Sequence, residues 1–139
     1  MIDQKTAPYA ALVLRLATGV AFLAHAYLKA FVFGMAGAGK YFASLGLPDW
    51  FVYPILALEV CGGLALLAGV LVRWVAIPLF FELLATIVLV HGANGWLASS
   101  KGGGGWEFPA VWAAAMLALA LLGDGAFALF PSSRIQARK

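Results

Sequence analysis

The sequence predicts an all-α membrane protein, a four-helix transmembrane bundle with both termini in the cytoplasm. Hydrophobic residues make up 64% of the 139 residues and charged residues only 11%, whereas soluble domains have about 25% charged residues. Four apolar stretches are each close to the roughly 20 residues that cross a bilayer as a helix. We therefore expect one membrane domain over residues 1–139, with the lipid bilayer as part of its solvent.

Prolines and tryptophans mark the ends of the expected helices. These helices cover residues 9–33, 50–72, 74–92 and 106–130. Pro54, Pro78 and Pro109 fall in or near first turns, where a missing N–H does least harm. Trp50, Trp74, Trp96 and Trp106 lie at span ends, as an aromatic belt at the membrane surface requires. The first stretch is too long for a signal peptide, so we expect a retained helix.

The three connections differ in length and composition. Residues 34–49 contain four glycines and a short amphipathic piece at 41–45, which is expected to lie in the membrane interface. Arg73 alone separates the second and third helices and predicts a tight hairpin. Residues 91–105 end in four consecutive glycines, Gly102 to Gly105, and predict a flexible loop.

The distribution of lysine and arginine predicts the orientation in the membrane. One side collects Lys5, Arg73, Arg134, Arg138 and Lys139, whereas the other side has Lys40 and Lys101. Because cytoplasmic loops carry the excess of these residues, both termini are expected inside and the two longer loops outside.

Net charge and cysteine content exclude several classes of function. The formal charge of +3, without a basic stripe interleaved with aromatic residues, does not predict a nucleic-acid partner. Cys61 is the single cysteine, so an intrachain disulfide, a Cys-x-x-Cys pair and a cysteine-based metal site are all excluded. We expect no metal site and no covalently bound cofactor.

Eight ionisable side chains lie inside the apolar stretches or at their edges, and they carry the functional signal. Burying Asp, Lys or Arg at a helix centre costs roughly 2.5–3.5 kcal/mol, so such residues are functional candidates. Their depths, counted at about 1.5 Å per residue, define an inner group, an outer group and one exception, Glu82. The inner group is Arg15 and Asp124, predicted to form a structural ion pair. The outer group is His25, Lys29, Glu59, His91 and Glu107.

Helical angles agree with this grouping on the first helix but not on the third. Arg15, His25 and Lys29 fall within roughly 80° of one another at 100° per residue. Glu82 and His91 are nine residues apart, which places them about 180° apart on an ideal helix. Either Glu82 serves a subunit interface, or the helix bends, or His91 lies beyond its regular part.

Four groups of residues together carry a family likeness. They are Arg15-Leu16, Gly19, Phe22, His25 and Lys29; Glu59, Gly62-Gly63 and Gly69; Arg73; and His91, Gly95-Trp96 and Trp106-Glu107-Phe108-Pro109. In this order they resemble the DoxX family of small bacterial integral membrane proteins, over nearly the whole chain. Glu82 has no counterpart in the family pattern.

The resemblance implies a multi-pass protein of the bacterial cytoplasmic (inner) membrane. Related proteins include a subunit of a thiosulfate:quinone oxidoreductase, so the resemblance implies an accessory or quinone-interacting subunit of a membrane redox system. The implied ligand is a quinone and the implied partner is a redox subunit. Further copies of the chain are another candidate partner. The resemblance assigns no catalytic residue, and whether the protein is an enzyme stays open.

Two hypotheses from different classes account for the outer group. In the first, His25 and Glu59 contact a quinone head group and exchange protons, while Lys29, His91 and Glu107 complete an outward path. In the second, the protein is a non-enzymatic membrane anchor or assembly module, and Lys29–Glu59 or Lys29–Glu107 are buried structural ion pairs. Haem between His25 and His91, a metal ion, and transport rank lower, because their motifs here are unspecific.

Overall fold

The structure is a computed structural model that describes residues 3–97 and 104–136. These residues are helical apart from turns and one isolated bridge between Val70 and Phe130. The elements in chain order are α1 (Ala7–Tyr27), the π-helix η1 (Leu28–Val32), α2 (Gly34–Ser44), the 3-10 helix η2 (Asp49–Phe51), α3 (Val52–Ala68), α4 (Val72–Thr86), the π-helix η3 (Ile87–His91), the 3-10 helix η4 (Gly92–Asn94), α5 (Glu107–Leu122) and α6 (Ser133–Gln136).

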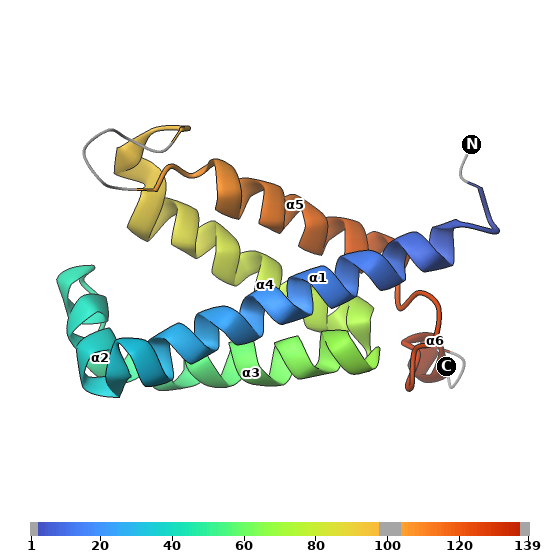
Figure 1. The fold of residues 1–139 in the computed structure, drawn as a ribbon, viewed down its shortest axis with the longest axis horizontal. Coiled ribbons are helices and arrows are strands. Elements are labelled where there is room, and N and C mark those ends of the chain that lie inside the picture. The colour runs from blue at the N-terminus through green and yellow to red at the C-terminus, as the bar shows by residue number, and fades with distance from the viewer. Residues whose placement is uncertain (1–2, 98–103, 137–139) are drawn as a thin grey trace.

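Three continuous helical segments are long and apolar enough to cross a membrane. They are Ala7–Val32, Asp49–Ala68 and Val72–Asn94, with 26, 20 and 23 residues. The shorter apolar helix α5 has 16 residues and packs mainly on α4. In Figure 1 the start of α1 and the helix α6 lie at one end of the molecule, and α2 lies at the other. The chain is a multi-pass membrane protein.

The expected fourth helix is too long at its C-terminal end. Instead of reaching residue 130, α5 ends at Leu122. Gly123 and Gly125 follow with φ angles of 90° and 74°, which residues with a Cβ rarely adopt. The chain then returns to the turn between α3 and α4, where the Phe130 N–H donates to the Gly69 carbonyl. Glycine therefore ends the helix although the sequence stays apolar.

The second and third helices meet in a different place from the one expected. α3 ends at Ala68, because Gly69 has a left-handed φ of 69° and closes the helix. A Cβ on Gly69 would lie 2.7 Å from the Cα of Ala128, so the close approach of the returning chain also requires glycine. The turn is tight, as predicted, but Arg73 lies inside α4 rather than between the helices.

The two longer connections also differ from expectation. Residues 34–44, expected to be mostly a glycine-rich link, form the helix α2, which starts at Gly34 with φ 70° and is followed by Gly46 with φ 83°. Residues 98–103 of the predicted flexible loop, including Lys101, Gly102 and Gly103, lie outside the described residues. Arg138 and Lys139, used to predict the orientation, also lie outside them.

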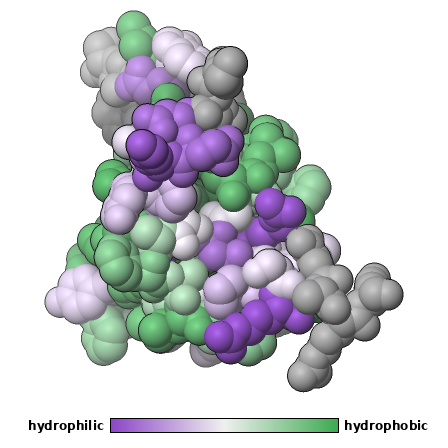
Figure 2. Space-filling model, turned by 90° about the vertical axis from the view of Figure 1, so that its right-hand side faces the viewer, coloured by the Kyte–Doolittle hydropathy of each residue, from purple (hydrophilic) through white to green (hydrophobic). Residues whose placement is uncertain are grey.

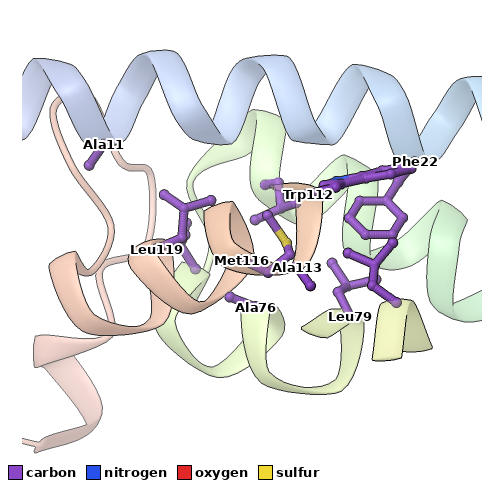
Figure 3. Packing of buried hydrophobic residues seen from close by; sticks show 11 residues of the cluster. Ala11, Phe22, Ala76, Leu79, Trp112, Ala113, Met116 and Leu119 are labelled. Atoms are coloured by element: carbon purple, nitrogen blue, oxygen red, sulfur yellow. The ribbon is translucent and has the colours of Figure 1, made fainter. Parts of the chain in front are cut away.

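The core lies between α1, α4 and α5, with α3 packed on α1. Figure 3 shows Phe22 of α1 near Trp112 of α5, and Leu79 of α4 belongs to the same cluster of buried side chains. The rings of Phe22 and Trp112 lie 4.4 Å apart. Gly19 and Gly63 bring α1 and α3 together, since a Cβ on Gly19 would lie 3.0 Å from the Gly63 carbonyl oxygen.

The outer surface is apolar along the helices and polar at the end that carries α6. Large hydrophobic side chains point outward, among them Val13, Phe31 and Leu121, which are 65–76% exposed. Figure 2 looks onto the end with α6 and shows hydrophilic residues gathered there, with hydrophobic residues beside them. This distribution suits helices whose sides face lipid and whose end faces water.

Candidate functional site

A cavity of about 960 Å³ lies at the end of the molecule opposite α6. Its walls come from the end of α1 with η1, from α2, from the start of α3, from the end of α4 with η3, and from the start of α5. Most of the lining is apolar or aromatic. The acidic and basic side chains on the wall are His25, Lys29, Glu59, Glu82 and His91. A large apolar cleft with a few converging polar groups is typical of a small-molecule site.

An ion pair between Lys29 and Glu59 lies in this cavity. The Lys29 Nζ is 2.6 Å from the Glu59 Oε1, and the two side chains are 20% and 4% exposed. Lys29 lies in η1, beyond the end of α1, and helical side chains lean toward the helix N-terminus. The long lysine stem therefore reaches back to Glu59, in the middle of α3.

Glu82 lies beside Glu59 because of how α3 and α4 pack. These consecutive helices run antiparallel (Figure 1), and Gly62 allows close contact, since a Cβ there would lie 2.9 Å from the Leu79 Cδ1. Glu59 comes three residues before Gly62 and Glu82 three residues after Leu79, so the two carboxyl groups are level and neighbour each other. Among the described residues, neither Glu59 Oε2 nor Glu82 Oε2 has a hydrogen-bond partner.

The π-helix η3 explains why Glu82 and His91 both line the cavity. An ideal α-helix would place Glu82 and His91 on opposite sides, so that only one of them could face the cavity. In η3, residues Ile87–His91 form the wider turns of a π-helix, which advance less in angle per residue. His91 therefore lies beyond the regular α-helical part of this segment, as one of the three interpretations predicted.

A contact with the following loop holds His91. Its Nδ1 lies 2.7 Å from the Gly104 carbonyl oxygen, and the Asn94 side-chain amide donates to the same oxygen at 2.8 Å. A carbonyl can only accept, so Nδ1 carries the hydrogen, an assignment made from its partner. In the neutral ring the Nε2 is then an acceptor.

An aromatic group forms the wall beside His25. The His25 ring lies 5.1 Å from Trp112 in a T-shaped arrangement, and Trp112 also contacts Phe22 and Phe108. The indole Nε1 of Trp112 is buried and has no hydrogen-bond partner among the described residues. Sequence reasoning missed Trp112. The available signal was its position six residues inside the fourth apolar stretch, away from the membrane surface where the other tryptophans lie.

Glu107 is the one member of the outer group that does not line the cavity. The structure brings His25, Lys29, Glu59 and His91 to the same cavity, but Glu107 is absent from its wall. Glu107 lies in the first turn of α5, where its charge is favoured by the positive end of the helix dipole. Lys29 is paired with Glu59, so of the two predicted pairs the Lys29–Glu59 one is present.

At the opposite end of the molecule, Arg15 binds main-chain carbonyl groups. This side chain is 1% exposed. Its Nη1 donates to the carbonyls of Leu66 and Leu67 at 2.9 and 2.7 Å, and its Nη2 donates to the Ala126 carbonyl at 2.8 Å. The first two carbonyls belong to the last turn of α3, where a cation is favoured by the helix dipole.

The predicted ion pair between Arg15 and Asp124 is not formed, and this part of the prediction is corrected. Asp124 accepts hydrogen bonds from the Val72 N–H and from the N–H and hydroxyl of Ser132, all at 2.8 Å. Val72 is the first residue of α4, so the carboxylate caps a helix start. The two residues lie in the same region, but the end of α3 and the start of α4 each have main-chain groups that lack partners within the helix, and these groups bind Arg15 and Asp124.

Other candidate sites are weaker. In the described part of the chain, no group of three or more His, Cys, Asp or Glu side chains could hold a metal ion. Cys61 is exposed on the outer face of α3, away from the cavity wall.

Comparison with known proteins identifies the family of the chain. A family model described as DoxX matches residues 10–92, which hold all five acidic and basic residues of the cavity. The chain is also similar to a Bacillus subtilis (strain 168) protein named "Putative oxidoreductase CatD", with 35% identity over 79 residues. That match covers 57% of this chain and 58% of the relative, so the chain spans little more than half of it. No solved structure matches. Because the family model covers more than half of the chain, the protein belongs to the DoxX family.

Proposed function

We propose that this protein is an accessory or quinone-interacting subunit of a bacterial membrane redox system, and that the cavity is its ligand site. The observation that carries the proposal is a Lys29–Glu59 ion pair, with Glu59 buried and Lys29 partly buried, in an apolar cavity of about 960 Å³. Such a pair is costly inside a membrane and therefore points to function. The name of the Bacillus subtilis relative, "Putative oxidoreductase CatD", supports a redox role.

The cavity offers the chemistry that a quinone requires. Lys29 can donate a hydrogen bond to a carbonyl oxygen, and the His91 Nε2, an acceptor in the neutral ring, can accept one from a quinol hydroxyl. The apolar residues from α2 and α3 suit an isoprenoid tail. The single cysteine excludes an intrachain dithiol relay, so we propose that a partner subunit exchanges electrons with the ligand.

The proposed orientation follows from where the basic residues lie. We propose that α5 crosses the membrane with the three longer segments and that both termini are in the cytoplasm. Arg73 and Arg134 lie near the end that carries α6, whereas Lys40 lies in α2 at the other end. The cavity then opens toward the outside of a bacterial cytoplasmic (inner) membrane.

Quinone binding tests the proposal directly. The protein is purified in mild detergent, its lipids are analysed by mass spectrometry, and a short-chain quinone is titrated against tryptophan fluorescence. We expect co-purified quinone, and quenching that is largely lost in Trp112→Phe because that indole lies on the cavity wall. Glu59→Gln should abolish binding and preserve membrane insertion, whereas Glu107→Gln, off the wall, is the matched control. Equal quenching of all variants would disprove the site.

The Lys29–Glu59 pair also favours the second candidate function, a membrane anchor or assembly module. In that case the pair only holds α1 against α3, and apolar residues of similar size can replace both partners together. The double variant Lys29→Met, Glu59→Leu separates the two functions. Retained assembly of the redox complex with normal electron transfer supports the anchor. Retained assembly with lost quinone binding and lost electron transfer supports the ligand site.

A further inference from the structure

We propose that Glu59 and Glu82 hold one proton between them, so that Lys29, Glu59 and Glu82 form an electrically neutral cluster on the cavity wall. The inference deepens the proposed function, because it adds Glu82 to that site as a proton-binding residue. It implies that the cavity takes an uncharged ligand and can exchange a proton with it. The delivery of that proton to a quinone rests on the proposed function, whereas the shared proton does not.

The first argument is a count of charges. One ammonium group, on Lys29, faces two carboxyl groups in a cavity with mostly apolar walls. If both carboxyl groups were ionised, like charges would be adjacent and one would have no counter-ion, which is strongly unfavourable in a low-dielectric site. A single proton removes both problems. Two neighbouring carboxyl groups that share one proton are a known arrangement in acid–base sites.

The second argument is the hydrogen-bond geometry. Glu59 is 3% exposed and its Oε1 is bound by Lys29, while its Oε2 has no partner among the described residues. The Oε2 of the neighbouring Glu82 is likewise buried without a partner. An ionised carboxylate can only accept, so two such oxygens cannot satisfy each other. A proton on either oxygen makes it a donor, and one proton then accounts for both.

The other groups around the pair do not replace this proton. From α1 and η1, His25 and Lys29 face the cavity, and η3 contributes His91. Lys29 is already bound to Glu59, and the Nδ1–H of His91 is used by Gly104. The α2 and α5 walls contribute aromatic residues such as Tyr41 and Trp112 but no charged side chain. In the described part of the chain Lys29–Glu59 is the one ion pair, so no cation contacts Glu82.

Infrared spectroscopy of the ligand-free, full-length protein tests the inference. A protonated carboxyl group has a C=O stretching band that ionised carboxylates lack and that shifts in heavy water. We expect this band near neutral pH in the wild type. It should disappear in both Glu82→Gln and Glu59→Gln, since either change leaves one carboxylate paired with Lys29. Glu107→Gln, which changes a carboxyl group off the wall, should keep the band.

Removal of the cation gives the opposite result. In Lys29→Met both carboxyl groups are present, but the one that is ionised in the wild type loses its counter-ion. It should then bind a second proton, so the band should increase about twofold. Glutamine has nearly the shape of protonated glutamate, so Glu82→Gln should keep the wild-type unfolding temperature, which shows that a lost band does not reflect misfolding. A wild-type spectrum without the band, or a band unchanged in Glu82→Gln, overturns the shared proton.

The outcome is separable from that of the quinone experiment. If the band is present but no quinone binds, the proton-holding pair stands and the proposed ligand is wrong. If quinone binds and quenches Trp112 but the band is absent, the ligand site stands and the shared proton is disproved. The Glu82→Gln variant can also bind quinone normally while electron transfer into the bound quinone becomes independent of pH. In that case Glu82 is the group that exchanges the proton with the quinone.

Discussion

At the scale of single residues, the buried polar side chains act on helix ends and on one another. Arg15 binds carbonyls at the end of α3, and Asp124 binds the N–H at the start of α4. Both therefore satisfy main-chain groups that a helix leaves unpaired at its ends. At the other end of the molecule, Lys29, Glu59 and Glu82 instead meet side chain to side chain on a cavity wall. The first group stabilises the fold, and the second is available for function.

Replacing Arg15 is expected to destabilise the protein without changing the cavity. Arg15→Met removes three hydrogen bonds and leaves carbonyls of α3 and of Ala126 unpaired, which should cost about 2–4 kcal/mol. The measurement is thermal unfolding in detergent, monitored by circular dichroism. Arg73→Met is the matched control, because its guanidinium donates one bond of 3.2 Å to the Leu121 carbonyl. Equal stability of both variants would contradict the role assigned to Arg15.

At the scale of elements, glycines and π-helices decide how the helices meet. Gly19 and Gly63 let α1 approach α3, and Gly62 lets α3 approach α4. The π-helix η1 ends the first membrane segment, and η3 lies near the end of the third, before η4; both line the cavity, and π-helices are frequent at functional sites. The π-helix η3 places His91 on the same wall as Glu82, which a uniform α-helical period does not.

A larger side chain at Gly63 is expected to separate α1 from α3. In Gly63→Val, the new Cβ alone would lie 2.9 Å from the Leu23 Cγ and 3.1 Å from the Gly19 carbonyl oxygen. Main chain cannot move aside as a side chain can, so we expect a loss of about 1–3 kcal/mol in the free energy of unfolding.

The control for Gly63→Val is Gly37→Val in α2. A Cβ at Gly37 has a single neighbour, Phe33 Cβ at 3.9 Å, so this variant should keep the wild-type unfolding temperature. Because the contact of α1 with α3 positions the Lys29–Glu59 pair, quinone binding should also weaken in Gly63→Val and stay unchanged in Gly37→Val. A Gly63→Val protein as stable as the control would show that the two helices do not depend on this glycine.

At the scale of the whole molecule, the two ends have different roles. The end with α6 is polar and holds the Arg15 and Asp124 contacts, while the other end holds the cavity. Three segments are long enough to cross the membrane, and α5 is shorter. Whether α5 also crosses decides on which side the C-terminal part of the chain lies.

Labelling of single cysteines tests the crossing of α5. In a Cys61→Ala background, the variants Gln4→Cys, Ser133→Cys and Lys40→Cys each place a thiol at an exposed position. A membrane-impermeant reagent added outside intact cells is expected to label Lys40→Cys and to leave the other two unlabelled until the cells are opened. Labelling of Ser133→Cys from outside, with Gln4→Cys protected, would mean that α5 does not cross.

Much of the fold could be predicted because it depends on local sequence. Runs of apolar residues set where the membrane segments lie, and the spacing of ionisable residues along them placed His25, Lys29, Glu59 and His91 toward one end. Helix ends were predicted less well, because the apolar sequence continues through Gly69 and Gly123 while the backbone turns there. A left-handed glycine interrupts the hydrogen-bond ladder without changing the hydropathy.

The sequence by itself determined that this is a helical membrane protein with costly charges at defined depths, since hydropathy and residue counts are properties of each segment alone. Only the tertiary structure decided which groups those charges meet. It turned Arg15 and Asp124 toward helix ends, left Glu107 off the cavity and brought Glu82 beside Glu59. The physical reason is that partners depend on the contact between α3 and α4 at Gly62 and on the angular shift in η3. Neither follows from an ideal helical period.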